Sequence, residues 1–234
     1  MSQQSISEVQ DSIQQTSKGL KMRVLDLFAG TGSATKAFRD AGHEVISVEY
    51  DPYFEADERN VLDLTADYLI NKYGEFDFVW ASPPCTTFSV ASCRIYWQQV
   101  DGKAVPKDDR VYAALDLVAH TIKLIQELNP QYGWLMENPR GMLRKQDVVK
   151  DLPRTTITYC QYGDTRMKPT DLWGHVPGWT SRPMCSPGDS CHEAASRGTA
   201  TGTQRLRSPR LRSMIAPDLS IELLTAVDNY GTKP

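Results

Sequence analysis

The chain has 234 residues, of which 40% are hydrophobic and 24% charged, and its formal net charge is −3, values typical of one globular domain. No apolar run approaches the roughly 20 residues needed to span a bilayer, and the weakly negative charge excludes a uniformly basic nucleic-acid-binding protein, so any such contact must come from a local basic cluster. Five cysteines without a repeating framework, and the lack of a secretory signal, favour a reducing compartment, and we expect the cytoplasm.

Residues 1–20, rich in Ser and Gln, are expected to form a disordered leader, and a short docking helix is the alternative. Beyond them, short apolar segments alternate with helical patterns. The expected strands are 23–28, 44–49, 76–81 and 134–137, and the expected helices are 33–41, capped by Ser33, and 111–128. This alternation predicts a parallel, doubly wound α/β sheet with ligands at the carboxyl ends of its strands.

After about residue 161 the pattern changes to a stretch rich in Pro, Gly and Ser, and an apolar helical pattern returns at 218–227. We therefore expect a core at 21–170, a small irregular lobe at 171–212, and a C-terminal helix within 213–234 that returns to the core. Five arginines and no acidic residue lie between positions 197 and 212, a composition that suits phosphate contacts. The alternative for this segment is a solvated linker.

A glycine turn, Asp26-Leu-Phe-Ala-Gly30-Thr-Gly32-Ser33, follows the first expected strand. Its glycines let the backbone turn tightly and approach a ligand closely. A dinucleotide-binding turn would have a third glycine near Thr35, so a smaller nucleoside is favoured. Glu49 is placed to accept hydrogen bonds from ribose hydroxyls and Asp63 to meet an adenine amino group, although either acid could simply be solvated.

The segment Ala81-Ser82-Pro83-Pro84-Cys85 places a thiol on a stiff loop directly after an apolar strand. This position suits a nucleophile, and the alternative is a structural cysteine. Glu137-Asn138-Pro139 ends another apolar strand, where a partly desolvated carboxyl group can hold or share a proton. The alternative for Glu137 is a helix cap or a salt bridge.

In this order, Asp-Leu-Phe-Ala-Gly-Thr-Gly, Ser-Pro-Pro-Cys and Glu-Asn-Pro resemble the cytosine carbon-5 DNA methyltransferase family over about residues 22–170. The segment Arg212-Ser-Met-Ile-Ala-Pro217 is similar to a late element of that family. The resemblance implies a Rossmann-like fold, S-adenosylmethionine as methyl donor, and duplex DNA with a flipped-out cytosine as substrate.

The resemblance also implies residue roles. Cys85 would add to carbon 6 of the base, Glu137 would hydrogen-bond or protonate ring nitrogen 3, and Arg166 would bind the carbonyl oxygen. Two features depart from the family: Thr165 stands where a glutamine usually precedes that arginine, and the final cofactor-proximal Gly-Asn-Ser segment is not recognisable.

The remaining residues are assigned to two sites. The cofactor site is expected to contain Asp26, Phe28, Ala29, Gly30, Thr31, Gly32, Ser33, Glu49, Tyr50, Asp63, Leu64 and Pro83. The substrate site is expected to contain Ser82, Pro84, Ser89, Asn138, Pro139, Lys168, Arg205 and Arg207. A loop at 92–110 is expected to offer Arg94, Lys103, Lys107 and Arg110 to phosphates.

Cys185, Cys191 and His192, with Cys160 or His175 as a fourth ligand, could bind zinc, but the spacing is unusual and we favour reduced cysteines without a metal. Competing interpretations are an RNA cytosine acceptor, a modified one-carbon donor, a non-catalytic DNA-binding family member and, disfavoured by the glycine turn, a nicotinamide oxidoreductase. The short stretch after Arg166 predicts a target of about two to four base pairs. We expect a monomer of phage or bacterial type, with restriction protection, genome marking and a first step of base hypermodification all open as roles.

Overall fold

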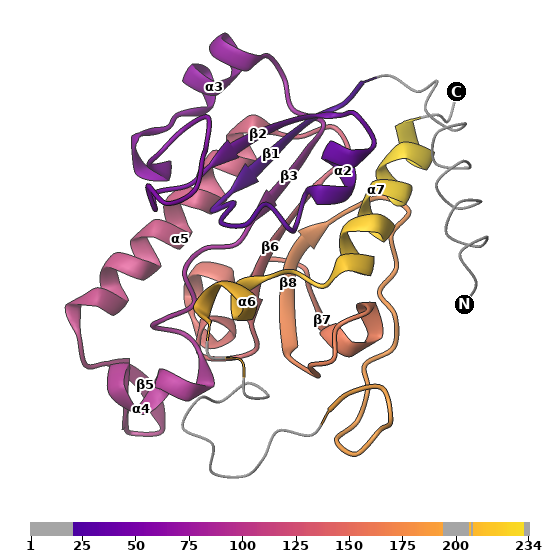
Figure 1. Cartoon of the computed structure of the whole chain (residues 1–234). Coiled ribbons are helices and arrows are strands. Elements are labelled where there is room, and N and C mark those ends of the chain that lie inside the picture. The colour runs from indigo at the N-terminus through magenta and orange to yellow at the C-terminus, as the bar shows by residue number, and fades with distance from the viewer. Residues whose placement is uncertain (1–20, 194–205, 207, 232–234) are drawn as a thin grey trace.

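The computed structural model describes residues 21–193, 206 and 208–231, so the expected leader at 1–20 lies outside the described residues. Its centre is a six-stranded sheet with the order β2-β1-β3-β6-β8-β7 (Figure 1). The strands are β1 (Arg23–Leu27), β2 (Glu44–Val48), β3 (Phe78–Ala81), β6 (Trp134–Pro139), β7 (Arg154–Thr158) and β8 (Pro169–His175). Strands β2, β1, β3 and β6 are parallel, and β8 runs antiparallel to both β6 and β7.

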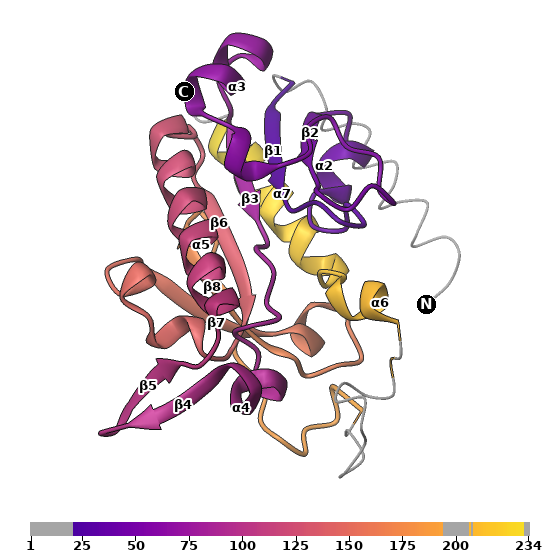
Figure 2. The same ribbon diagram turned by 90° about the vertical axis from the view of Figure 1, so that its left-hand side faces the viewer.

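Helices cover both faces of the sheet (Figure 2). Helices α3 (Ala66–Tyr73) and α5 (Asp109–Leu128) pack on one face, against the side of β1 that carries Leu25 and Leu27. Helices α2 (Lys36–Asp40) and α7 (Pro217–Gly231) pack on the other, where Val24 and Trp80 are buried. Because successive side chains of a strand point to opposite faces, burial on both sides explains the continuous apolar runs in the sequence. The predicted doubly wound α/β fold is confirmed.

The remaining short elements connect these layers. They are η1 (Val61–Asp63), η2 (Val90–Ser92), α4 (Cys93–Tyr96), η3 (Leu143–Lys145), η4 (Asp147–Val149), η5 (Tyr159–Tyr162) and α6 (Pro209–Ser213). Within the described part of the chain, no helix is both long and apolar enough to cross a membrane.

Helix α2 begins at Lys36, so the expected start at 33 with Ser33 as its cap is wrong. The Ser33 hydroxyl instead accepts a hydrogen bond from the Ile215 amide at 3.0 Å, and the Thr35 hydroxyl donates to Asp26 Oδ2 at 2.5 Å. Both hydroxyls are therefore committed to tertiary contacts, and the turn after β1 extends to residue 35.

Strand β8 crosses the boundary expected between 170 and 171, so the sheet continues into the segment assigned to the lobe. Its Asp171 is fully buried, and Arg144 Nε and Nη2 donate to its two oxygens at 2.9 and 2.5 Å. Thr156 Oγ1 donates to the same carboxylate at 2.7 Å. These donors allow a charged residue in a central strand, since a buried carboxylate is tolerated only with such partners.

The segment 92–110 is largely a hairpin rather than the expected loop. Strands β4 (Trp97–Val100) and β5 (Lys103–Pro106) pair across a two-residue turn in which Asp101 and Gly102 have φ of 49° and 76°. The hairpin projects from the body of the molecule beyond α5 (Figure 2). Two of the four residues expected to contact phosphates have partners within the protein near the base of the hairpin. Lys107 Nζ donates to the Arg94 carbonyl at 2.8 Å, and Arg110 pairs with Asp108 at 2.6 Å.

Candidate active site

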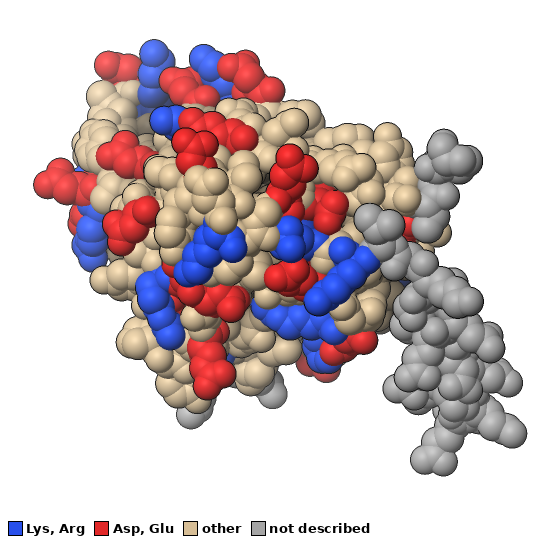
Figure 3. Space-filling view, turned by 90° about the horizontal axis from the view of Figure 1, so that it is seen from above, with Lys and Arg blue, Asp and Glu red and all other residues tan. Residues whose placement is uncertain are grey.

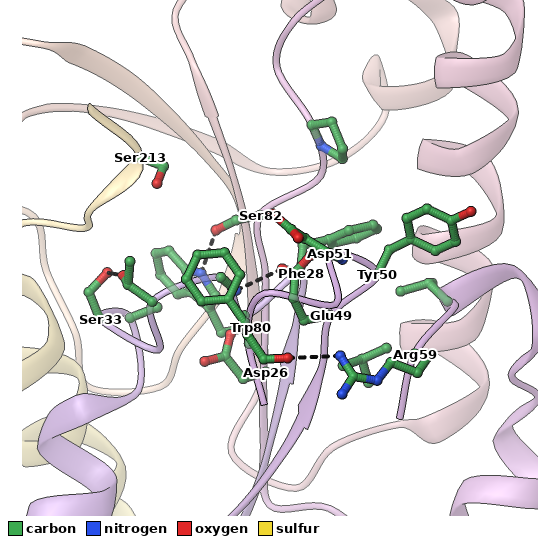
Figure 4. Close-up of a pocket in the computed structure, with 18 of the residues that line it drawn as sticks. Asp26, Phe28, Ser33, Glu49, Tyr50, Asp51, Arg59, Trp80, Ser82 and Ser213 are labelled. Carbon is green, nitrogen blue, oxygen red and sulfur yellow. Dashed lines mark hydrogen bonds between the residues drawn. The ribbon is translucent and has the colours of Figure 1, made fainter. Parts of the chain in front are cut away.

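A cavity of about 530 Å³ lies at the carboxyl ends of β1, β2 and β3 (Figure 4). Its wall comes from the glycine turn after β1, the residues that follow β2, the start of the loop after β3, and the α6 segment. A partly apolar cavity of this size at strand ends suits a nucleoside-sized ligand.

Glu49, the residue after β2, lines the cavity. Its Oε2 accepts a hydrogen bond from the Gly30 amide at 2.8 Å, and its Oε1 accepts one from the Asp51 amide at 2.8 Å. These bonds fix the carboxylate while each oxygen keeps a further lone pair. The group is therefore placed to accept hydrogen bonds from vicinal hydroxyls of a ligand.

Asp26 comes from the neighbouring strand β1 and is 1% exposed. Burial raises the pKa of its carboxyl group to about 6, while the hydrogen bond from Thr35 and the charge of Arg39 act in the opposite direction. The carboxyl is therefore mainly charged at neutral pH and becomes neutral as the pH falls through about 6. Such a buried anion in the cavity wall suits a cationic group of a ligand.

Most of the expected cofactor residues line this cavity, namely Asp26, Phe28, Ala29, Gly30, Thr31, Ser33, Glu49 and Tyr50. The expected residues Gly32, Asp63, Leu64 and Pro83 are not among the lining residues. Asp63 instead accepts a hydrogen bond from Asn60 Nδ2 at 3.0 Å, and Leu64 is buried in the core. The neighbouring Asn60, Val61 and Leu62 take their place in the wall, because η1 turns these residues toward the cavity.

Part of the wall was not predicted from the sequence. Arg210 and Ser213 of α6, followed by Ile215, line the cavity opposite the strand ends. The Arg210 guanidinium carbon lies 3.2 Å from the ring centroid of Tyr53, so α6 also contacts the segment after β2. No local pattern could reveal a wall formed by segments so far apart in the chain.

The loop that carries Cys85 is fixed from two sides. The Phe88 and Ser89 amides donate to the Cys85 carbonyl at 3.0 and 2.9 Å, which closes a tight turn, and Ser89 Oγ lies 2.8 Å from Ser92 Oγ. From β6, the buried Asn138 Nδ2 donates to the Pro83 carbonyl at 2.9 Å. Because Ser82 and Pro84 line the cavity, Cys85 follows directly on its wall.

The loops after β3 and β6 are in close contact. A Cβ atom placed on Gly141 would lie 2.2 Å from the Phe88 carbonyl oxygen, so only glycine allows this approach. The Met142 amide donates to the same oxygen at 2.7 Å. The end of β6, which carries Glu137 and Pro139, is thereby brought to the side of the Cys85 loop.

Glu137 is 5% exposed and has two partners that the sequence did not indicate. The Tyr159 hydroxyl donates to its Oε1 at 2.9 Å, and Lys168 Nζ lies 3.6 Å from the same oxygen. Lys168 also lies 4.3 Å from the centroid of the Tyr159 ring. Within the described part of the chain, Oε2 of Glu137 accepts no hydrogen bond, which leaves one carboxyl oxygen available to a ligand.

The electrostatic surroundings of Cys85 favour its thiol form. Burial raises the pKa of the Cys85 thiol, and the negative charge of Glu137 raises it further, while the cations Lys168 and Arg212 lower it. The thiolate fraction at neutral pH is therefore small. Removal or shielding of the Glu137 charge would lower the pKa of this thiol.

Arg166, expected to bind the carbonyl oxygen of the base, has partners within the protein. Its guanidinium forms an ion pair with Asp164, and its Nη1 donates to the Arg212 carbonyl at 3.0 Å. Arg166 therefore holds the segment before α7 in place, whereas Lys168, expected only in the substrate site, is the cation beside Glu137. Arg205 and Arg207 lie outside the described residues.

The fold and the site are those of a Rossmann-like, S-adenosylmethionine-dependent methyltransferase. They combine a doubly wound sheet, a glycine turn, an acid after β2 and a nucleoside-sized cavity beside a cysteine loop. The sequence profile of the family described as "C-5 cytosine-specific DNA methylase" matches residues 22–158. The chain is also 32% identical over 224 residues, covering 87% of this chain and 99% of the relative, to the "Probable DNA (cytosine-5)-methyltransferase" of Frog virus 3 (isolate Goorha). The chain therefore belongs to the C-5 cytosine-specific DNA methylase family, and S-adenosylmethionine is its methyl donor.

Two further likenesses are more partial. The "Type II methyltransferase M.XorII" of Xanthomonas oryzae pv. oryzae is 29% identical over 134 residues, which are 50% of this chain but 28% of that protein. A solved methyltransferase structure from Entamoeba histolytica has a TM-score of 0.47 and 13% identity, and covers 70% of this chain and 56% of that one.

The expectation that this cavity holds the cofactor leads to a first prediction. Replacement of Glu49 with glutamine should weaken S-adenosylmethionine binding by about 10- to 100-fold, because hydrogen bonds to a charged carboxylate are lost. Isothermal titration calorimetry with the cofactor alone measures this change. Glu55→Gln is the matched control, since the exposed Glu55 does not line the cavity. Equal affinity of the Glu49 variant and the wild type would contradict the assignment.

Proposed function

We propose that this DNA (cytosine-5)-methyltransferase acts through a covalent adduct between Cys85 and carbon 6 of a cytosine flipped out of duplex DNA. The observation that carries the proposal is the position of the Cys85 loop. On one side, Ser82 and Pro84 of this loop line the cofactor cavity. On the other side, the loop is near the buried carboxyl group of Glu137. A nucleophile, a proton-carrying group and a methyl donor site are thus adjacent.

The residues of the cavity fit S-adenosylmethionine. Glu49 would accept hydrogen bonds from the two ribose hydroxyls, and Asp26 would lie nearest the ammonium group, because it is the buried anion of the wall. Phe28, Val61 and Leu62 would contact the adenine ring with apolar surface. The bound cofactor supplies an electrophilic methyl group for transfer to carbon 5.

Carbon 5 of cytosine is a weak nucleophile, and addition of a thiolate at carbon 6 makes it reactive. As the sulfur–carbon bond forms, the electron pair of the ring double bond moves toward carbon 5, and negative charge develops at nitrogen 3. Glu137 would donate a proton or hydrogen bond through its unoccupied Oε2 to that nitrogen. A proton held by Glu137 would also remove the charge that disfavours the Cys85 thiolate. After transfer, a base such as water removes the carbon-5 proton, and the electron pair of that bond re-forms the ring double bond as the Cys85 thiolate leaves. The proton on nitrogen 3 returns to Glu137.

Lys168 and Tyr159 would orient Glu137 during these steps. Both contact Oε1, so the carboxyl group is fixed with its other oxygen toward the base. We assign to Lys168, rather than to Arg166, the cationic contact with the base carbonyl, because the donors of Arg166 are committed to Asp164 and to the segment before α7. This assignment revises the expectation from the resemblance.

Duplex DNA would approach from the strand-end side of the sheet, where the β4–β5 hairpin projects. On the opposite end of the molecule, basic and acidic side chains of the described residues are intermingled, so that face offers no concentrated positive potential (Figure 3). We also propose that the protein is a monomer in a reducing cytoplasm; the five free thiols support the choice of compartment.

The acceptor is tested by methyl transfer from labelled S-adenosylmethionine to duplex DNA, single-stranded DNA and RNA of matched sequence. Duplex DNA should accept the label, and sequencing of the methylated positions should reveal a target of about two to four base pairs. Duplex DNA in which every cytosine already carries a carbon-5 methyl group is the control and should accept none. Transfer to RNA alone would overturn the DNA assignment, and a strict six-base target would contradict the expected short site.

A further inference from the structure

Three cysteines and a histidine from two separate segments lie close together at η5. Cys160 belongs to η5, and Cys185, Cys191 and His192 belong to the irregular stretch that follows β8. One potential ligand atom from each of the four residues lies within 4.8 Å of all the others. Nothing in the methyl-transfer chemistry uses this group.

The distances match tetrahedral coordination of one ion. Cys160 Sγ lies 3.6 Å from Cys191 Sγ, and His192 Nδ1 lies 3.7 and 3.6 Å from Cys185 Sγ and Cys191 Sγ. Around a tetrahedral zinc ion with Zn–S of about 2.3 Å and Zn–N of about 2.0 Å, such pairs are separated by about 3.5 to 3.8 Å. The Cys160–Cys185 pair, at 3.1 Å, is somewhat closer. No bond joins the sulfurs, since all these cysteines are free thiols.

The backbone around the four residues is arranged to bring them together. The Ser186 amide donates to Asp189 Oδ2 at 2.6 Å and the Asp189 amide donates to the Ser186 carbonyl at 3.1 Å, so the chain turns back between the two cysteines. Cys185 is tied to the end of β7 by a hydrogen bond from its amide to Thr158 Oγ1 at 3.0 Å. Gln161 Nε2 donates to Cys191 Sγ at 3.3 Å, as an outer partner of a ligating sulfur does.

A cross-link would stabilise the stretch from 176 to 193. It contains no helix or strand, and most of its side chains from 180 onward are exposed or only partly buried. A bound ion would hold this stretch against η5, whose first residue, Tyr159, contacts Glu137.

We propose that Cys160, Cys185, Cys191 and His192 bind one structural Zn²⁺ ion. Three soft sulfur ligands and an imidazole favour zinc over magnesium or calcium, and four protein ligands leave no open position for catalysis. The proposal replaces our sequence-based preference for reduced cysteines without a metal. Of the two candidates for the fourth ligand, the geometry selects Cys160 and excludes His175 from the cluster.

The first test is the metal content of the full chain, expressed without a metal-binding tag and purified under reducing conditions without chelator. Plasma mass spectrometry should find about one zinc per chain in the wild type. Cys191→Ser and His192→Ala should each lower the zinc content severalfold, and these sites are exposed or partly buried, so the fold should tolerate the changes. The control Cys93→Ser, which removes a cysteine outside the cluster, should keep its zinc.

Two further measurements on the wild type do not depend on the folding of a variant. Cobalt in place of zinc should give the intense visible absorption of tetrahedral thiolate coordination. Cys160, Cys185 and Cys191 should resist alkylation until a strong chelator is added, and the chelator should lower the melting temperature by about 5 °C or more. Less than about one tenth of a zinc per chain in reduced wild type, with all three thiols alkylated equally fast with and without chelator, would overturn the proposal. A Cys160–Cys185 disulfide in freshly isolated protein would also overturn it.

Discussion

Methyl transfer should fall by about 10³-fold or more when Cys85 is replaced with alanine, because no other described nucleophile lies between the cofactor cavity and Glu137. Cofactor affinity should remain within about twofold of wild type, since Cys85 does not line the cavity. Initial rates with labelled S-adenosylmethionine and calorimetric titration measure the two quantities separately.

The covalent step has its own readout. Incubation of the wild type with cofactor and duplex DNA containing 5-fluorocytosine should yield an adduct that survives denaturation, because fluorine at carbon 5 cannot leave as a proton does. Cys85→Ala should give none, while the control Cys93→Ser should give as much as the wild type, since Cys93 lies on α4 outside the site. An adduct in the Cys85 variant would refute the proposed nucleophile.

Replacement of Glu137 with glutamine should change two rates in opposite directions. Methylation should fall by about 10²- to 10⁴-fold, because glutamine cannot donate a proton to ring nitrogen 3 as a carboxylic acid does. Alkylation of the Cys85 thiol by iodoacetamide near neutral pH should become faster, because removal of the Glu137 charge lowers the pKa of Cys85.

The pH dependence of Cys85 alkylation tests the same electrostatic coupling between Glu137 and Cys85. In the wild type the pKa of Cys85 is raised, so its alkylation rate should keep rising with pH beyond the range usual for a cysteine. In Glu137→Gln the midpoint of that profile should move to lower pH, whereas the control Glu127→Gln, at an exposed position on α5, should leave it unchanged. Coincident profiles in wild type and Glu137→Gln would show that the two groups are not coupled.

The parallel half of the sheet could be predicted from the sequence, and the antiparallel half could not. Strands buried on both faces appear as mostly apolar segments, as in Phe78 to Ala81 and in Val24 to Leu27, where Asp26 is the one polar residue. Strand β7 reads Arg-Thr-Thr-Ile-Thr and β8 reads Pro-Thr-Asp-Leu-Trp-Gly-His, so neither has such a segment. Asp171 is compatible with a central strand only because Arg144 lies beside it, and that contact is tertiary. The β4–β5 hairpin did carry a local signal, the Asp101-Gly102 pair, which was overlooked.

The candidate site also has a part that the sequence could predict and a part that it could not. Cys85, Glu137 and Glu49 could be proposed from the sequence because each lies at or just after the end of an apolar strand, in a short, distinctive segment. Tyr159 carried no signal of its own, since its hydrogen bond to Glu137 depends on how η5 packs against β6. Arg166 and Lys168 are two residues apart, and spacing cannot reveal that Arg166 pairs with Asp164 and with the backbone before α7 while Lys168 lies beside Glu137.

The hydrogen bonds that join the glycine turn and α2 to the C-terminal segment affect the order in which parts of the chain fold during synthesis. Ile215 to Ser33 and Ala37 to Ser220 join positions 182 and 183 residues apart. Because such distant contacts close a very long loop, they form late and slow the overall folding rate. During synthesis, the glycine turn leaves the ribosome long before α6 and α7 exist, so the nascent chain has a cofactor cavity with one wall missing. The ability to bind the methyl donor is then among the last properties that a newly made molecule acquires.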